Sequence, residues 1–402
     1  MQMVIDGDGH LAEPISLWGE YVDPDLRDRI NVRTDERGNQ VLTVGDFRMA
    51  LHIADADGRA AALGGGAYST GDTLNPNGLD RGRPRRRPYS EAHPGGFYPR
   101  QRLAVHDAEG IDAAVLFPSM GLFFAGVSDP AVAIGACRAV NRWAADYCAA
   151  APRELYTVAI LAAQDPAAAA AELERSVKQH GCVAGCLRPN PTRAGRTLGD
   201  PSLDVLWAAA QDLDVPLCFH NALNTDVPQA GLDRARSFVL GHAIVHPMEQ
   251  MLAFASLLEA GVFDRFPRLR TGFMESNCGW LPFWVDRLDE HFERLGWMLA
   301  NAPKRKPGEI FREQCVIGCE NGEPMLPYVQ SRFGEDRVLW ASDFPHFDAE
   351  VPGLVSLRKR TDLSESQREG VLWRGAARFY KLDPEAIARS RAARVAESVR
   401  QL

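Results

Sequence analysis

The N-terminal stretch Ile5-Asp6-Gly7-Asp8-Gly9-His10-Leu11-Ala12-Glu13-Pro14 joins a short apolar run to the pair Asp8 and His10. Side chains two apart on a strand point to the same side, so we expect Asp8 and His10 to face the same way. At the carboxyl end of a barrel strand, such a pair faces the mouth of the barrel and can share one divalent cation. The stretch therefore predicts a first strand that ends in metal ligands. The alternative is a loop in which the pair makes ordinary hydrogen bonds.

Short apolar runs alternate with amphipathic stretches along the rest of the chain. The expected strands are residues 4–5, 113–117, 155–161, 182–187, 215–219, 269–274, 315–319 and 338–341. The expected helices are residues 129–149, 165–179, 201–212, 247–260, 279–297, 323–332 and 365–379. Eight strands that alternate with helices predict parallel βα units, which close into an α/β (β/α)8 barrel of the TIM type; an open doubly wound sheet is the alternative.

Composition agrees with one globular barrel and excludes several classes of protein. The chain has 402 residues, of which 46% are hydrophobic and 24% charged, with a net charge of −8. A barrel uses 200 to over 400 residues as a single domain. The negative charge gives no reason to expect a nucleic-acid or membrane partner. No apolar run is long enough to span a membrane, and the N-terminus is not typical of a signal peptide, so we expect a cytoplasmic protein.

Two segments lie outside the regular alternation. Residues 58–100 contain a glycine run and the arginine-rich segment 81–87, and show neither a helical nor a strand period. We expect this segment to be a long insertion after the first strand, near the site as a lid. Its arginines are either a site for a phosphate or CoA-like anion or a solvated loop.

From the pattern of strands and helices we expect one barrel domain over residues 1–385 and a tail helix over 386–402.

Three further expected strands end in residues that bind metals. His220 ends the fifth strand, Glu275 the sixth, and Asp343 the eighth, with His346 close behind it. The candidate ligands are Asp8, His10, Glu13, His220, His246, Glu275, Asp343 and His346. Some have other interpretations: Glu13 suits the N-terminus of a short helix after Pro14, and His246 suits the cap of a helix that starts at Pro247. His242 lies four residues before His246, a spacing found in metal sites, but because a helix is expected only from Pro247 we expect His242 to support a ligand or to be structural.

These motifs resemble the amidohydrolase superfamily, in particular its amidohydrolase-2 branch of nonoxidative decarboxylases and hydrolases. The resemblance rests on Asp8-Gly9-His10, His220, the stretch 261–267, the stretch 275–280 and Ser342-Asp343-Phe344-Pro345-His346. It implies that Asp8, His10, His220 and Asp343 bind a divalent metal.

The chain departs from this pattern at Glu275, where the branch's decarboxylases have a histidine. A carboxylate beside a dication is ionised and binds as a ligand, which puts decarboxylation in doubt. Eight candidate ligands are enough for two metals bridged by a carboxylate such as Glu275 or Asp343. In this respect the chain is similar to the amidohydrolase-related dinuclear oxygenases.

The leading functional hypothesis is therefore a dinuclear non-heme iron or iron–manganese monooxygenase. It would use O2 to hydroxylate a small organic acid or its thioester, with Glu275, Asp343 and His346 as catalytic residues. The first alternative is a hydrolase or nonoxidative decarboxylase with one zinc or manganese ion, acting on a small carboxylated or cyclic substrate. The second is a non-catalytic partner subunit. The resemblance also implies a homodimer or larger oligomer, and no nucleotide-cofactor motif is present.

Overall fold

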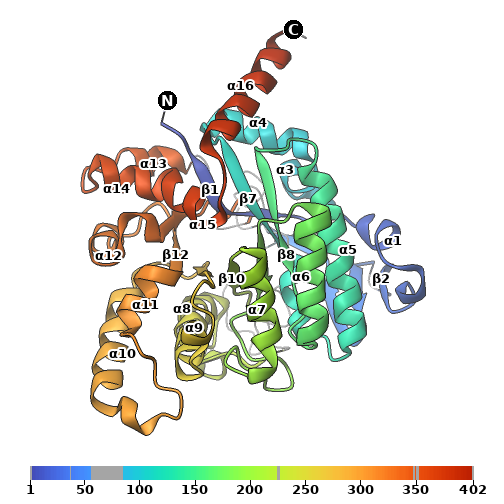
Figure 1. The fold of residues 1–402 in the computed structure, drawn as a ribbon. Helices are drawn as coiled ribbons and strands as arrows, with labels where there is room; N and C mark the ends of the chain where they lie inside the picture. Colours follow the sequence, from blue (N-terminus) through green and yellow to red (C-terminus); the bar gives the residue numbers. More distant parts are fainter. Residues whose placement is uncertain are drawn as a thin grey trace.

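Eight parallel strands lie side by side and are surrounded by helices (Figure 1). In spatial order they are β1 (Ile5–Leu11), β7 (Ala113–Pro118), β8 (Leu155–Ile160), β9 (Ala184–Leu187), β10 (Leu217–His220), β11 (Thr271–Met274), β12 (Cys315–Cys319) and β13 (Val338–Trp340). The computed structural model describes residues 2–400 except 37, 56–84, 224–226, 347–348 and 350–352. All eight expected strands are present, so the prediction of a (β/α)8 barrel is confirmed.

The barrel closes where the segment after β13 returns to β1. The backbone N–H of His10 donates to the carbonyl of Phe344 at 2.8 Å. The buried carboxylate of Asp6 accepts a hydrogen bond from the backbone N–H of Ser342 at 3.0 Å. These bonds join the first strand to the last, so the alternative of an open sheet is wrong.

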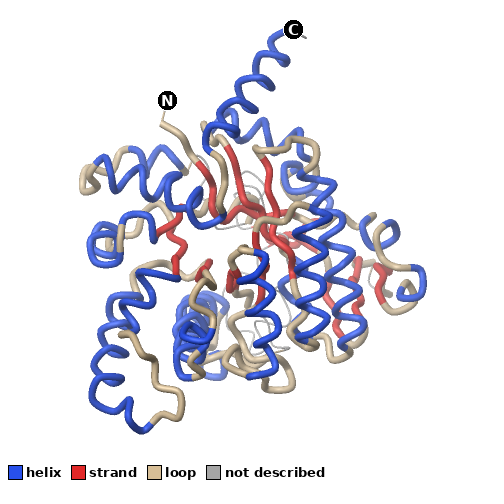
Figure 2. Tube along the Cα trace, in the orientation of Figure 1, coloured by secondary structure: helices blue, strands red, loops and turns tan. Residues whose placement is uncertain are grey.

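Helices follow most of the strands and cover the outside of the barrel (Figure 2). The expected ones are α5 (Pro130–Cys148), α6 (Pro166–His180), α7 (Asp204–Leu213), α8 (Phe238–Glu259), α10 (Leu281–Leu295), α12 (Leu326–Phe333), α14 (Glu365–Glu369) and α15 (Gly375–Tyr380). Shorter helices that the sequence did not reveal are α1 (Leu17–Glu20), α9 (Val262–Arg265), α11 (Pro307–Gln314) and α13 (Leu354–Arg358). The Asp165 side chain caps α6 by accepting a hydrogen bond from Ala168 N, which a residue before a first-turn proline is well placed to do.

Helix α8 corrects the expectation that a helix begins at Pro247. It begins nine residues earlier, at Phe238, and the Ser237 side chain caps it by accepting a hydrogen bond from Leu240 N. Pro247 lies inside the helix, where a proline removes one backbone donor but does not always end a helix. The consequence for the site is large, because residues 242 and 246 now lie one turn apart on one helical face.

The segment between β1 and β7 carries small elements of its own. Strands β2 (Ile30–Thr34), β3 (Gln40–Val44) and β4 (Phe47–Ala50) form an antiparallel sheet, and β5 (His52–Asp55) pairs with β6 (Arg85–Pro88). Two helices, α3 (Pro94–Phe97) and α4 (Pro99–Glu109), then lead into β7. The expectation of an irregular segment over 58–100 is thus wrong for its last part. Residues 56–84, with most of the arginine-rich segment, lie outside the described residues.

The chain ends in α16 (Pro384–Arg400), whose far end extends away from the barrel (Figure 1). Its near end is anchored: Ile387 is buried, and Arg394 Nε lies 2.8 Å from a carboxylate oxygen of Glu154. Within the described ranges, none of the helices combines the length and apolar character needed to cross a lipid bilayer.

The cysteines belong to the core. All eight are buried and free, and several, such as Cys186 and Cys218, lie on barrel strands. Burial raises the pKa of the Cys218 thiol above its ordinary value, which keeps the thiol protonated and unreactive.

Candidate metal centre

The first group of converging side chains comes from β1 and from β10, which is the fifth strand from β1 in the spatial order of the barrel. Asp8 and His10 come from β1, and His220 ends β10; all three are buried. His220 Nε2 lies 3.0 Å from His10 Nε2 and 3.5 Å from Asp8 Oδ1. One ligand atom of each residue lies within 4.8 Å of the other two, a spacing that one metal ion can span.

The second group adds the residues that follow β13. Asp343 Oδ1 lies 3.4 Å from His10 Nε2 and 2.6 Å from His346 Nδ1. Asp343 has a φ of 53°, in the left-handed region, which directs its side chain back towards β1. These three residues also have ligand atoms within 4.8 Å of one another, so His10 belongs to both groups.

The third group lies beside the first and comes from α8 and β11. Glu275 follows β11, while His242 and His246 lie one turn apart on α8. Glu275 Oε1 lies 3.4 Å from His246 Nε2 and 4.0 Å from His242 Nε2, and Glu275 Oε2 lies 3.1 Å from His220 Nε2. One carboxylate therefore faces two groups of imidazoles.

Backbone carbonyls and one hydroxyl fix where several of these imidazoles carry hydrogen. His220 Nδ1 lies 2.8 Å from Asn221 O, and His246 Nδ1 lies 3.0 Å from His242 O. A carbonyl can only accept, so Nδ1 carries the hydrogen and the Nε2 lone pair of each neutral ring turns inward. An imidazole that donates through one nitrogen and faces carboxylates with the other is arranged as a metal ligand.

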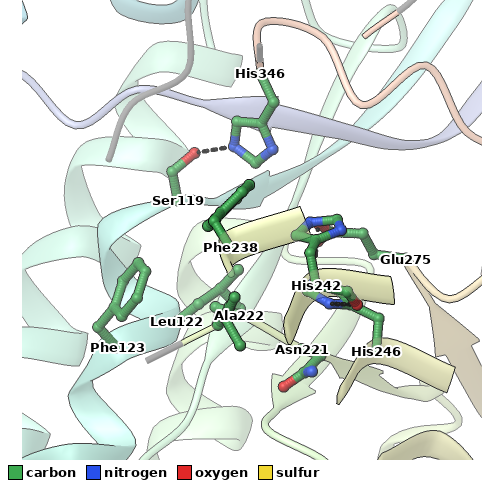
Figure 3. A pocket seen from close by; sticks show the side chains of 11 residues that line it. Ser119, Leu122, Phe123, Asn221, Ala222, Phe238, His242, His246, Glu275 and His346 are labelled. Carbon is green, nitrogen blue, oxygen red and sulfur yellow. Dashed lines mark hydrogen bonds and ion pairs between the residues drawn. The ribbon is translucent and has the colours of Figure 1, made fainter. Parts of the chain in front are cut away.

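The same reasoning applies to His346 through Ser119, which follows β7. Ser119 Oγ donates to Leu11 O at 2.6 Å, so it accepts from His346 Nε2 at 2.8 Å (Figure 3). His346 Nε2 therefore carries a hydrogen. In the neutral ring, the Nδ1 lone pair then faces the Asp343 carboxylate at 2.6 Å. Because His346 Nδ1 and Asp343 Oδ1 would both be acceptors, a cation or a proton must lie between them.

Burial and the neighbouring charges set the protonation of the first group. Burial lowers the pKa of His10 well below its ordinary value, so His10 is neutral and able to bind a metal. Burial also lowers the pKa of His220, but the carboxylates of Asp8 and Glu275 outweigh it and raise that pKa to about 9. Without a metal, the site attracts a positive charge to His220. The donor set thus fits a divalent cation bound by oxygen and nitrogen.

Glu13 is the expected ligand that the structure places elsewhere. Its two carboxylate oxygens accept hydrogen bonds from the backbone N–H groups of Met120 and Gly121, both at 2.9 Å. These amides begin the short 3-10 helix over Met120–Gly126. Glu13 is absent from the three groups of potential ligands found among the described residues. Its carboxylate binds a helix N-terminus, but this is the 3-10 helix after β7 and not a helix after Pro14, which was the alternative expected from the sequence.

His242 and Ser119 are the site residues that sequence reasoning missed. His242 was expected only to support a ligand or to be structural, because the helix was placed after it, although its four-residue spacing from His246 is a signal for paired ligands. Ser119 carries no sequence signal, since its partner His346 is 227 residues away.

A cavity opens beside the third group (Figure 3). Apolar side chains form much of its wall, and histidines and Glu275 form the side next to the ligands. The lining residues are Ser119, Leu122, Phe123, Asn221, Ala222, Leu223, Phe238, His242, His246, Glu275 and His346. A small molecule with an apolar body would place its reactive group against the metal ligands.

Comparison with known proteins gives a family match and similar sequences. A family model described as amidohydrolase matches residues 5–382. A gamma-resorcylate decarboxylase from Polaromonas is 26% identical over 295 residues, which cover 70% of this chain and 87% of that protein. The decarboxylase orsB from Emericella nidulans is 30% identical over 251 residues, which cover 58% of this chain and 71% of that protein.

Solved structures share the fold at lower identity. An amidohydrolase from Mycobacterium avium subsp. paratuberculosis superposes with a TM-score of 0.73 at 20% identity, covering 94% of this chain and 99% of that chain. A dihydroxybenzoic acid decarboxylase from Polaromonas, solved with bound manganese and the inhibitor 2-nitroresorcinol, gives a TM-score of 0.62 at 21% identity. That match covers 95% of this chain and 98% of the other.

Proposed function

Because the chain belongs to the amidohydrolase family, we propose that it is a divalent-metal-dependent decarboxylase, which releases CO2 from a small carboxylic acid without oxidising it. The observation that carries the proposal is the convergence of buried carboxylate and imidazole groups beside an apolar cavity. Both curated relatives are decarboxylases, which favours this reaction over the hydroxylation expected from the sequence.

Asp8, His10, His220 and Asp343 would hold the cation. Two carboxylates and two imidazoles suit manganese, iron or zinc, and the Polaromonas dihydroxybenzoic acid decarboxylase is a manganese-bound protein of the same fold. When bound, the cation would polarise an oxygen of the substrate and neutralise its negative charge. The apolar wall of the cavity, including Leu122 and Phe123, would hold the rest of the substrate and exclude water.

The reaction also needs a proton donor, which we assign to His246 together with Glu275. To act in this way the His246 ring must carry a second hydrogen, on Nε2, beside the Glu275 carboxylate. In decarboxylation the bond between the substrate carbon and its carboxyl group breaks, CO2 leaves, and the electron pair left on carbon takes up one proton. The sequence put this reaction in doubt because β11 ends in Glu275 and not in a histidine. Helix α8 supplies the imidazole that β11 lacks. His246 Nε2 lies 3.4 Å from Glu275 Oε1, and His246 lines the cavity.

The test is CO2 release from hydroxylated benzoic acids by the manganese-loaded protein. A His246→Asn variant should lose on the order of 10²–10⁴-fold in kcat, as expected for a general acid, while keeping its manganese. His180→Asn, on the remote end of α6, is the matched control and should keep its activity. Failure of the wild-type protein to release CO2 from any acid of this class would contradict the proposal.

A second candidate function is favoured by the third group of ligands. Glu275 faces His220 with one oxygen and His246 with the other, as a carboxylate bridging two cations would. With His242, this group would hold a second ion, and the dinuclear iron or iron–manganese monooxygenase expected from the sequence requires such a site.

Metal analysis separates the two functions. A decarboxylase of the proposed kind should bind one ion per chain, and His246→Asn should not change that number. A dinuclear oxygenase should bind two ions, lose one in the same variant, and transfer 18O from O2 into its product. One ion per chain in the wild-type protein would remove the second candidate.

A further inference from the structure

Arg102 is a buried arginine at the back of the metal centre. It lies on α4, has no exposed surface, and directs its guanidinium group at three backbone carbonyls. Nη2 donates to His10 O, Nη1 donates to Phe344 O at 3.1 Å, and Nε donates to Gly95 O at 3.1 Å. The guanidinium also lies 4.5 Å from the centre of the Phe344 ring.

The three carbonyls belong to three segments that meet behind the ligands. His10 is on β1, Phe344 directly follows the ligand Asp343, and Gly95 is on α3. Phe344 O is the junction, because it accepts from His10 N at 2.8 Å as well as from Arg102. The rigid planar fork of one guanidinium thus fixes the distance between the end of β1 and the segment that follows β13.

This arrangement has an electrostatic cost that packing alone does not explain. Among the described residues, no carboxylate lies within ion-pair distance of Arg102. Three carbonyl dipoles, an aromatic ring and the more distant buried carboxylate of Asp6 therefore compensate a fully buried charge. A buried apolar side chain would avoid that cost. A leucine or methionine could not, however, donate hydrogen bonds to the carbonyls of His10 and of Phe344, the residue that follows Asp343.

We propose that Arg102 is a positioning residue for the metal centre, which holds the backbones of His10 and Phe344 so that the His10 imidazole and the Asp343 carboxylate converge on one cation. Arg102 touches neither the cation nor the substrate and acts only through these two carbonyls. The inference rests on the metal centre of the proposed function but not on the reaction catalysed there.

The test measures Mn²⁺ binding to purified full-length variants by calorimetry and by the EPR signal of bound manganese. Arg102→Met should raise the dissociation constant for Mn²⁺ on the order of 10–100-fold, as removal of groups that orient ligands typically does. Arg102→Lys keeps the charge but has no fork, so it should fall between the wild-type protein and Arg102→Met. Millimolar guanidinium ion should partly restore Mn²⁺ binding to Arg102→Ala, which a general loss of stability would not allow.

Arg358→Met is the matched control. Arg358 also donates to two backbone carbonyls, those of Glu109 and Gly110, but they carry no ligand. This variant should bind Mn²⁺ like the wild-type protein. An unchanged Mn²⁺ affinity in Arg102→Met would overturn the proposal; if that variant does not fold, an unchanged affinity in Arg102→Lys decides against it equally. Absence of Mn²⁺ binding in the wild-type protein would instead contradict the proposed metal centre.

Discussion

His10 and His220 face each other through their Nε2 atoms at 3.0 Å, although 210 residues separate them in the chain. His220 donates its Nδ1 hydrogen to Asn221 O, so in the neutral ring its inward nitrogen has only a lone pair to offer. Two nitrogens and the Asp8 carboxylate then surround a point that needs a positive charge. The barrel supplies this relationship, because β1 and β10 end at the same mouth.

Replacement of His220 tests whether that positive charge is a metal ion. His220→Ala removes one ligand of the first group, so its Mn²⁺ affinity should fall by at least about 100-fold, more than the loss typical of an outer partner. Metal content after dialysis and a calorimetric titration measure the effect. A variant that binds Mn²⁺ as tightly as the wild-type protein would exclude His220 from the ligands.

Glu13 provides a contrasting prediction, because the sequence grouped it with the ligands. Glu13→Gln should keep full metal content, since its carboxylate contacts the amides of Met120 and Gly121 and not a ligand. The variant should still lose about 1–3 kcal/mol of stability, because its amide nitrogen would face a backbone donor. Loss of metal from Glu13→Gln with an unchanged unfolding temperature would reverse this assignment.

Glu13 should also make stability depend on pH. Burial raises the pKa of Glu13 from 4.5 to about 7, against the opposing effect of the backbone amides. Between these two values the folded state keeps a proton that the unfolded chain has released. The stabilisation is therefore complete below pH 4.5 and is lost as the pH rises through 7. Urea titrations at pH 5 and pH 8 should show a larger decrease in the free energy of unfolding for the wild-type protein than for Glu13→Gln. The variant keeps the smaller decrease due to Asp6, whose pKa burial raises to about 6.

The strands and most of the candidate ligands were predictable because each depends on a few adjacent residues. A short apolar run that ends in Asp8, His220 or Glu275 predicts a strand and also places that polar side chain at the mouth of the barrel, because all parallel barrel strands end there. The eight strands are where these runs lie. The partners behind the ligands were not predictable. Arg102 reaches Phe344 across 242 residues, and no local pattern of the sequence contains such a contact.

The position of His242 shows a different failure. A proline inside a helical pattern usually marks a boundary, so the sequence favoured a helix that starts at Pro247. In the folded protein, the Ser237 cap and the packing of Val245 and Phe254 keep α8 continuous through the proline. Tertiary contacts thus outweigh the local penalty, and the nine additional helical residues bring His242 to Glu275.

Gly9 should tolerate no side chain, because β1 is tightly packed beside the ligands. A Cβ atom at this position would lie 2.7 Å from the Asp6 carboxylate, which holds Ser342, and 3.2 Å from Leu116. Gly9→Ala should therefore destabilise the protein by about 1–3 kcal/mol. Gly19→Ala is the control, since no atom lies within 4 Å of its Cβ position. Thermal unfolding of both variants measures the difference. Equal midpoints would contradict the prediction, because they would show that β1 and its neighbours can move to accommodate a methyl group.

The wall of the cavity should determine substrate affinity separately from metal binding. Phe238 begins α8 and lines the cavity with its ring (Figure 3), so Phe238→Ala removes apolar contact with the body of the substrate. We expect KM to rise about tenfold with kcat little changed, which corresponds to about 1.4 kcal/mol of binding that is equal in the ground and transition states. Mn²⁺ content should stay the same, because the ring contributes no ligand. Phe283→Ala on α10 is the same substitution at a side chain that is 66% exposed and outside the cavity lining, and it should leave KM unchanged. A tenfold fall in kcat at constant KM would instead place Phe238 in the orientation of the reacting group.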